Sequence, residues 1–253
     1  MARARNAVSR HYGIAQVGVV LLAVFAYELM RLAIRPDWPL ALDHAREVDS
    51  WERAFHIDWE QRLQRAFLHA PGLVEAMNAL YLVGHFAITG LFFAWLYRRS
   101  PERFRVFRNA FLVATAIALA VDWGFPTAPP RLAGLGLEDT LRRLSGIDIG
   151  SPGSGGLSDP VAAVPSLHAG WAFGVGAGIV LVASSSLWRA AGALYPFAIV
   201  LTILVTGNHF VFDAFTGVAV MAMGLGIALA CEPAVVPFGS RRGVEQSGSS
   251  PGS

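Results

Sequence analysis

The chain has 253 residues, of which 54% are hydrophobic and only 15% are charged. A soluble domain carries about 25% charged residues, so this chain lacks the polar side chains to cover a water-facing globule. All 20 basic residues are arginine, scattered over the loops, and the net charge is +2. This pattern excludes the basic stripe of a nucleic-acid-binding protein, and the single Cys231 excludes an internal disulfide. We predict an all-helical, polytopic membrane protein whose single domain covers residues 1–231.

Six apolar segments approach the length of about 20 residues that a membrane-spanning helix needs. The first follows three arginines but lacks a small-residue cleavage site, which favours a retained anchor over a cleaved signal peptide. Arginines gather before the first span, in the loop 98–108 and after the last span, so both termini are predicted in the cytoplasm of a bacterial plasma membrane. The six predicted spans are 13–34, 73–97, 107–124, 165–184, 187–206 and 209–231.

Three segments outside the spans have a character of their own. Residues 125–164 form a long connection, and long ordered loops on compact domains are commonly binding loops, so this one is predicted to border the active site. Residues 232–253 are typical of a disordered tail. Over about 50–68, an apolar side chain recurs every fourth residue, which predicts one amphipathic helix in the headgroup region or packed on the bundle. Its apolar positions are Trp51, Phe55, Trp59, Leu63 and Phe67.

Polar side chains near the span ends are candidate functional residues. An ionisable group at membrane depth costs about 2.5–3.5 kcal/mol on insertion scales, so such groups are rarely kept without a role. The third predicted span ends, and the fourth and sixth begin, at the same outer face, so polar residues from three segments should meet there. The motifs are GFPTAPPRL, which puts Arg131 at the membrane surface, VPSLHAGWA with Ser166 and His168, and GNHFVFDAFTG with His209 and Asp213.

This set of side chains suits the chemistry of a phosphate ester. Arginine binds phosphate oxygens in a bidentate manner, one histidine can attack phosphorus, and a second can protonate the leaving oxygen. Asp213 follows His209 by one helical turn, so it can accept the second ring N–H and fix the tautomer. Ser166 and His168 lie in a first helical turn, where free backbone N–H groups favour an anion. Two alternatives are a set of ordinary caps and interhelical bonds, and a zinc site.

Together the motifs resemble the type 2 phosphatidic acid phosphatase superfamily. PSLH is followed about forty residues later by H-x-x-x-D-x-x-x-G, and PTAPPR, PSLHAG and GNHFVFDAFTG are similar to the inositol-phosphorylceramide synthase branch. The resemblance covers most of residues 45–225. It implies a six-helix core and chemistry that needs neither a metal nor a cofactor and passes through a phosphohistidine. It also implies that His209 is the nucleophile, Asp213 its orienting partner, His168 the general acid and Arg131 a phosphate clamp.

The motifs lack two basic residues of the wider superfamily pattern. Gly124 stands at the lysine position seven residues before Arg131, and Ile203 stands at an expected arginine position. PSLH also replaces the more common PSGH. These departures favour the synthase-like branch, whose motifs lack the same cations. Candidate replacements are the backbone N–H groups from Ser166 to His168, Arg142 and Arg143.

We therefore expect an integral membrane phosphotransferase or phosphatase that acts on a lipid-linked phosphate at the outer face. An alcohol acceptor such as inositol would make it a synthase, and water would make it a phosphatase. The alternatives are a polyprenyl-pyrophosphate or phosphatidate phosphatase of the same fold, and a non-catalytic lipid-binding or transport bundle. Tyr81 and His85, one turn apart in the second span, either bind substrate in the pocket or tie helices together.

Overall fold

The structure is a computed structural model that describes residues 37–149 and 161–231. The predicted first span, the middle of the long connection and the tail therefore lie outside the described residues. The described part consists of helices and turns, with one isolated parallel bridge between Thr127 and Ala162. The all-helical prediction is confirmed for these residues.

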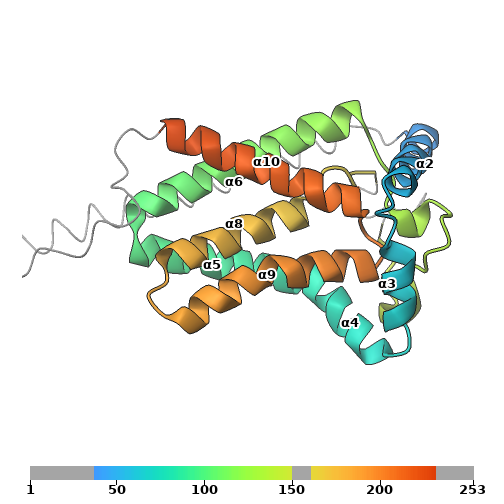
Figure 1. Ribbon diagram of the computed structural model, residues 1–253, viewed down its shortest axis with the longest axis horizontal. Helices are drawn as coiled ribbons and strands as arrows, with labels where there is room; N and C mark the ends of the chain where they lie inside the picture. Colours follow the sequence, from blue (N-terminus) through green and yellow to red (C-terminus); the bar gives the residue numbers. More distant parts are fainter. Residues whose placement is uncertain (1–36, 150–160, 232–253) are drawn as a thin grey trace, which may run out of the picture.

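Long helices run side by side along the long axis of the molecule (Figure 1). Helix α8 lies in the middle and packs against both α9 and α10, while α10 also packs against α6. Helix α4 continues through a π-helical turn, η1, directly into α5. The bounds are α4 Pro71–Ala79, η1 Leu80–Gly84, α5 His85–Arg99, α6 Pro101–Gly124, α8 Leu167–Val182, α9 Ser186–Val205 and α10 Val211–Cys231.

The described residues contain four helical runs that are long and apolar enough to cross a membrane: Pro71–Arg99, Pro101–Gly124, Ser186–Val205 and Val211–Cys231. These runs match four of the six predicted spans. The predicted span 165–184 is the shorter apolar helix α8, whose 16 residues extend about 24 Å against a hydrocarbon core of about 30 Å.

Glycines bring the beginnings of α8 and α10 into close contact. A Cβ on Gly170 would lie 2.6 Å from the carbonyl oxygen of Gly217, and a Cβ on Gly217 would overlap the carbonyl oxygen of Ser166. Small residues allow membrane helices to approach at backbone distance. The two helix starts that carry the second and third motifs are therefore held together without intervening side chains.

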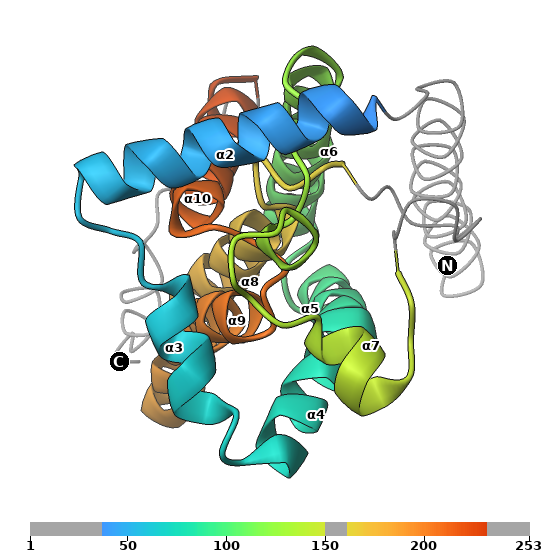
Figure 2. The same cartoon turned by 90° about the vertical axis from the view of Figure 1, so that its right-hand side faces the viewer.

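Short helices cover one end of the bundle, which we call the site end. Helix α2 (Trp38–Ala54) lies across the top of this end in Figure 2, and α3 (Glu60–Phe67) and α7 (Thr140–Ser145) lie at the same end below it. The predicted single helix over 50–68 is wrong, because the chain leaves the helix after Ala54 and His56 adopts φ 57°. This segment packs on the end of the bundle, which is one of the two positions expected for it.

Only part of the predicted apolar stripe faces the bundle, where Trp51, Leu63 and Phe67 pack against buried clusters. Phe55 and Trp59 are 75% and 47% exposed, whereas Glu52, Glu60 and Gln64 are buried. The reason lies in the end of the bundle, where the helices present backbone groups without partners inside their own helix. Polar side chains on α2 and α3 can bond to those groups, and apolar side chains cannot.

Candidate active site

The three motifs meet at the site end, although they are far apart in the sequence. Helix α6 ends at Gly124, the first residue of the first motif, and α8 and α10 begin inside the second and third motifs. Figure 1 shows these three helix ends at the same side of the molecule. The ring centroids of His168 and His209 are 5.8 Å apart. The fold therefore brings together a histidine of α8 and a histidine of the turn before α10.

Backbone hydrogen bonds join the three motifs to one another. The N–H of Ala163, the residue directly before the second motif, donates to the carbonyl oxygen of Thr127 in the first motif at 3.0 Å. The N–H of Ser166 donates to the carbonyl oxygen of Asp213 at 3.0 Å, which links the second motif to the third. The site is therefore set by main-chain geometry as well as by side-chain packing.

The tautomer of His209 follows from the partners of its Nδ1. This nitrogen lies 3.0 Å from the carbonyl oxygen of Ala163 and 3.3 Å from Oδ2 of Asp213. A carbonyl oxygen can only accept, so Nδ1 carries the proton and Nε2 carries the lone pair. Asp213 Oδ2 also accepts from the N–H of Phe210 at 2.8 Å, which fixes the carboxylate at the start of α10. Both His209 and Asp213 are buried.

Tyr81 positions His168 through its ring and its backbone carbonyl. Their rings stack with centroids 4.3 Å apart, and His168 Nε2 donates to the carbonyl oxygen of Tyr81 at 3.3 Å. That carbonyl lies in the π-helical turn. In an α-helix it would accept from the N–H of His85, but here that N–H donates to the carbonyl oxygen of Leu80. π-Helical turns occur frequently at functional sites. Here the turn places a backbone acceptor beside the ring of His168.

His85 is fully buried, and its ring packs against that of His168. Its Nδ1 is 2.8 Å from the hydroxyl oxygen of Tyr195 on α9, and its ring centroid is 5.1 Å from that of His168. His85 therefore ties α5 to α9 and also packs against the site. Tyr195 was not foreseen from the sequence, because a tyrosine within an apolar run gives no distinct signal.

Arg131 is buried within the protein, with its side chain only 3% exposed. Its Nε donates to Asn208 Oδ1 at 2.9 Å, and Nη1 pairs with Asp139 Oδ2 at 2.8 Å. Nη2 donates to the carbonyl oxygen of Ile149 at 2.7 Å. The charge can be buried because these groups compensate it. It still acts electrostatically on His209.

Other residues from the sequence analysis have structural partners of their own. Ser166 is fully buried and caps α8, since its Oγ accepts from the N–H of Ala169 at 3.3 Å. Ile203 is fully buried in an apolar cluster, so packing occupies the position where a cation was expected. Arg143 pairs with Glu138 in an exposed ion pair.

Two glutamates that the sequence analysis did not single out lie at the start of α10. Glu60 Oε1 accepts from the N–H of Val211, and Glu52 Oε1 accepts from the N–H of Phe212, both at 2.6 Å. Both side chains are buried. Their acidic character inside an amphipathic segment was the only signal, and the helical spacing assigned them to the solvent side.

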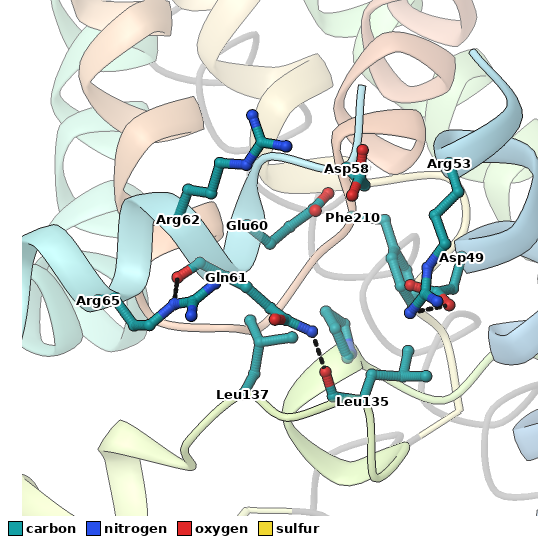
Figure 3. Close-up of a pocket in the computed structure, with 11 residues that line it drawn as sticks. Asp49, Arg53, Asp58, Glu60, Gln61, Arg62, Arg65, Leu135, Leu137 and Phe210 are labelled. Carbon is teal, nitrogen blue, oxygen red and sulfur yellow. Dashed lines mark hydrogen bonds and ion pairs between the residues drawn. The ribbon is translucent and has the colours of Figure 1, made fainter. Parts of the chain in front are cut away.

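A polar cavity of about 340 Å³ opens beside Glu60. Glu60 and Phe210 form part of its wall, together with Arg53 and Arg62 (Figure 3). An apolar cavity of about 390 Å³ lies near the start of α10 and includes Pro165. The site end therefore has a polar and an apolar recess on different sides of the third motif.

The zinc alternative requires His168, His209 and Asp213 to converge on one ion. Within 37–149 and 161–231, no group of three histidine, cysteine, aspartate or glutamate side chains is placed to hold a metal ion. The contacts of His209 Nδ1 with Ala163 and Asp213 make these residues a hydrogen-bonded set.

Comparison with known proteins agrees with this geometry. A family model described as the PAP2 superfamily matches residues 46–227, a range that contains all three motifs. Comparisons with curated proteins and with solved structures gave no match. The family match supports the superfamily and a phosphatase-type enzyme, and it does not distinguish the synthase-like branch. Since the match covers more than half of the chain, this protein belongs to the PAP2 superfamily, whose members are phosphoesterases.

Proposed function

We propose that the protein is a membrane-embedded lipid phosphotransferase or phosphatase that works through a phosphohistidine on His209. The arrangement that carries this proposal is the pair formed by His168 in α8 and His209 in the turn before α10, whose ring centroids are 5.8 Å apart. His209 has its proton on Nδ1 and its lone pair on Nε2, as a nitrogen nucleophile requires.

In the first half-reaction, Nε2 of His209 attacks the phosphorus of a lipid-linked phosphate. The N–P bond forms as the P–O bond to the leaving alcohol breaks, and His168 in its imidazolium form protonates the departing oxygen. Because Nε2 of His168 bonds to Tyr81, Nδ1 is the nitrogen that supplies the proton. Asp213 stabilises the positive charge that develops on the ring of His209.

In the second half-reaction, neutral His168 takes a proton from the acceptor while the acceptor oxygen attacks phosphorus. The N–P bond breaks and His209 is restored. An alcohol such as inositol gives a phospho-alcohol, and water gives inorganic phosphate. Three of the five N–H donors of Arg131 bond to protein acceptors, which leaves two for a phosphate oxygen in the transition state.

We further propose that the site lies at the outer face of a bacterial plasma membrane, with both termini in the cytoplasm. The distribution of arginines over the loops supports this orientation. PTAPPR and the buried Ile203 support the inositol-phosphorylceramide synthase-like branch.

The decisive experiment is to trap the intermediate. Brief incubation with a lipid whose phosphate is labelled should give a protein adduct that is labile in acid and stable in base. The adduct should be absent in His209→Ala and present in His69→Ala, which changes an exposed histidine between α3 and α4. An adduct of equal yield in His209→Ala would refute His209 as the nucleophile.

A panel of donors and acceptors then separates the two outcomes of the second half-reaction. Free phosphate without a new phospho-alcohol identifies a phosphatase, and a phospho-alcohol identifies a transferase. Activity that persists in excess chelator excludes the zinc alternative. Lipid binding with neither an adduct nor a product would identify a non-catalytic bundle.

A further inference from the structure

The start of α10 has an unusual set of partners. The first N–H groups of a helix have no acceptor within the helix, and usually one side chain caps them. Here three carboxyl groups do so, and they come from α2, α3 and α10 itself. Phe210 donates to Asp213 at 2.8 Å, Val211 to Glu60 at 2.6 Å and Phe212 to Glu52 at 2.6 Å.

Glu52 and Glu60 interact with each other as well as with the backbone. Glu52 is 1% exposed and Glu60 is 5% exposed. Oε2 of Glu52 is buried, and no residue that the structure describes donates a hydrogen bond to it. A proton on Glu52 explains the arrangement, because this carboxyl group then donates to the neighbouring carboxylate of Glu60. If both neighbouring carboxyl groups were ionised, their negative charges would repel each other.

We propose that Glu52 and Glu60 are positioning residues for the catalytic pair, and that the single proton they share fixes the start of α10 and thereby holds His209 against Ala163 and Asp213. The inference rests on the proposed function in so far as His209 is the nucleophile. Val211 and Phe212, which the glutamates bind, directly follow His209 and Phe210 in the chain. A displacement of this turn would move the attacking nitrogen.

The number of charges at this turn is part of the inference. With one proton shared, the pair adds one negative charge near Asp213, which interacts electrostatically with both glutamates. A second charge would add repulsion beside the carboxylate that serves His209. Glu60 lines the polar cavity, so solvent can exchange the proton (Figure 3). The other charged groups around the pair are Asp58 before α3, and Asp49, Arg53, Arg62 and Arg65 on the cavity wall.

The direction of the pH dependence follows from burial. Burial, with the neighbouring Glu60 as a smaller cause, raises the pKa of Glu52 from 4.5 to about 9, and burial also raises the pKa of Glu60. At a pH between 4.5 and about 9, Glu52 is protonated in the folded protein and ionised in the unfolded chain, so the folded protein binds more protons. The free energy of unfolding should therefore decrease as the pH rises from about 4.5 towards about 9.

Three variants on α2 test the inference. Glu52→Gln keeps an acceptor for Phe212 and a donor for Glu60, so it should retain turnover at neutral pH and lose the decline in stability that Glu52 causes at alkaline pH. Glu52→Leu removes the acceptor, and should lower kcat by about 10–10²-fold with KM little changed. Glu47→Gln changes an exposed glutamate on the same helix and should match the wild-type protein.

An infrared spectrum of the resting protein gives a readout that needs no turnover. The carboxylic acid C=O band at pH 7 should weaken in Glu52→Gln and remain unchanged in Glu47→Gln and His209→Ala. The absence of this difference would overturn the inference, as would full kcat in Glu52→Leu. If Glu52→Leu does not fold, the carboxylic acid band in the spectrum of Glu52→Gln alone tests whether the two glutamates share a proton. A band difference without any phosphohistidine would overturn the proposed function and leave the shared proton standing.

Discussion

The backbone carbonyl of Ala163 accepts a hydrogen bond from Nδ1 of His209 at 3.0 Å, a shorter distance than the 3.3 Å from this nitrogen to the carboxylate of Asp213. The main chain alone is therefore sufficient to select the tautomer of His209. Asp213 is left with two other tasks: it supplies negative charge beside the ring, and it accepts from the N–H of Phe210.

Asp213→Asn should lower kcat while the protein remains folded. The amide keeps an acceptor for Phe210, and Ala163 keeps the tautomer, so only the charge is lost. We expect a decrease of about 10²-fold, smaller than the loss of about 10⁴-fold that a wrong tautomer causes in a Ser-His-Asp triad. Turnover and thermal melting in detergent measure the two effects separately. Unchanged turnover would show that the charge of Asp213 does not contribute.

Arg131→Met should destabilise the protein, because it removes the guanidinium that pairs with the partly buried Asp139 and donates to the buried Asn208. Removing one member of a buried ion pair costs about 3–5 kcal/mol in the free energy of unfolding. Arg131→Lys should recover part of this stability, since it keeps the charge and loses the planar fork. Chemical denaturation measures the difference.

The matched control for Arg131 is Arg142→Met, which changes an exposed arginine on α7. It should alter the free energy of unfolding by no more than about 0.5 kcal/mol. Equal stability of the two methionine variants would contradict the buried network around Arg131.

Gly217→Ala should separate the starts of α8 and α10. The new Cβ would overlap the carbonyl oxygen of Ser166, which is backbone and cannot rotate away. Overpacking of this kind costs about 1–3 kcal/mol, and the shift should also reduce the yield of the phosphohistidine. Gly226→Ala, in open space on the same helix, should instead stabilise the helix by up to about 1 kcal/mol. Similar melting temperatures for both variants would refute the close approach.

Tyr195→Phe should lower stability more than it lowers turnover. The substitution leaves Nδ1 of the buried His85 without its partner, which costs about 1–3 kcal/mol. His168→Gln should show the opposite pattern, with turnover lost and stability largely kept. If Tyr195→Phe abolished turnover without a loss of stability, His85 would have to contact the substrate instead of tying helices.

The sequence predicted the long helices and the meeting of the motifs for clear physical reasons. Apolar runs of sufficient length can only be satisfied as helices in lipid, and counting them assigns each helix end to one side. His168 and His209 therefore came together as expected. The pairing of Asp213 with His209 followed from helical spacing alone.

The environment of Arg131 and the face of α2 and α3 could not be predicted in the same way. The partners of Arg131 lie on irregular segments, Asp139 before α7 and Asn208 before α10, and the path of such segments is not encoded in a repeating pattern. The apolar spacing over 50–68 predicted one buried stripe, of which Phe55 and Trp59 are exposed. It contained no information about the unpaired N–H groups of α10, which determine that Glu52 and Glu60 face inward.

The parallel bridge between Thr127 and Ala162 has a consequence for any attempt to transplant this chemistry. The carbonyl that orients His209 belongs to Ala163, and the N–H of the same residue is fixed by the first motif. A chimaera that exchanges one motif with a relative and shifts the path of its main chain would lose a backbone hydrogen bond that no side chain can restore. Specificity should therefore be exchangeable between relatives only when the three segments move as a set, whereas the lipid-facing helices between them can vary independently.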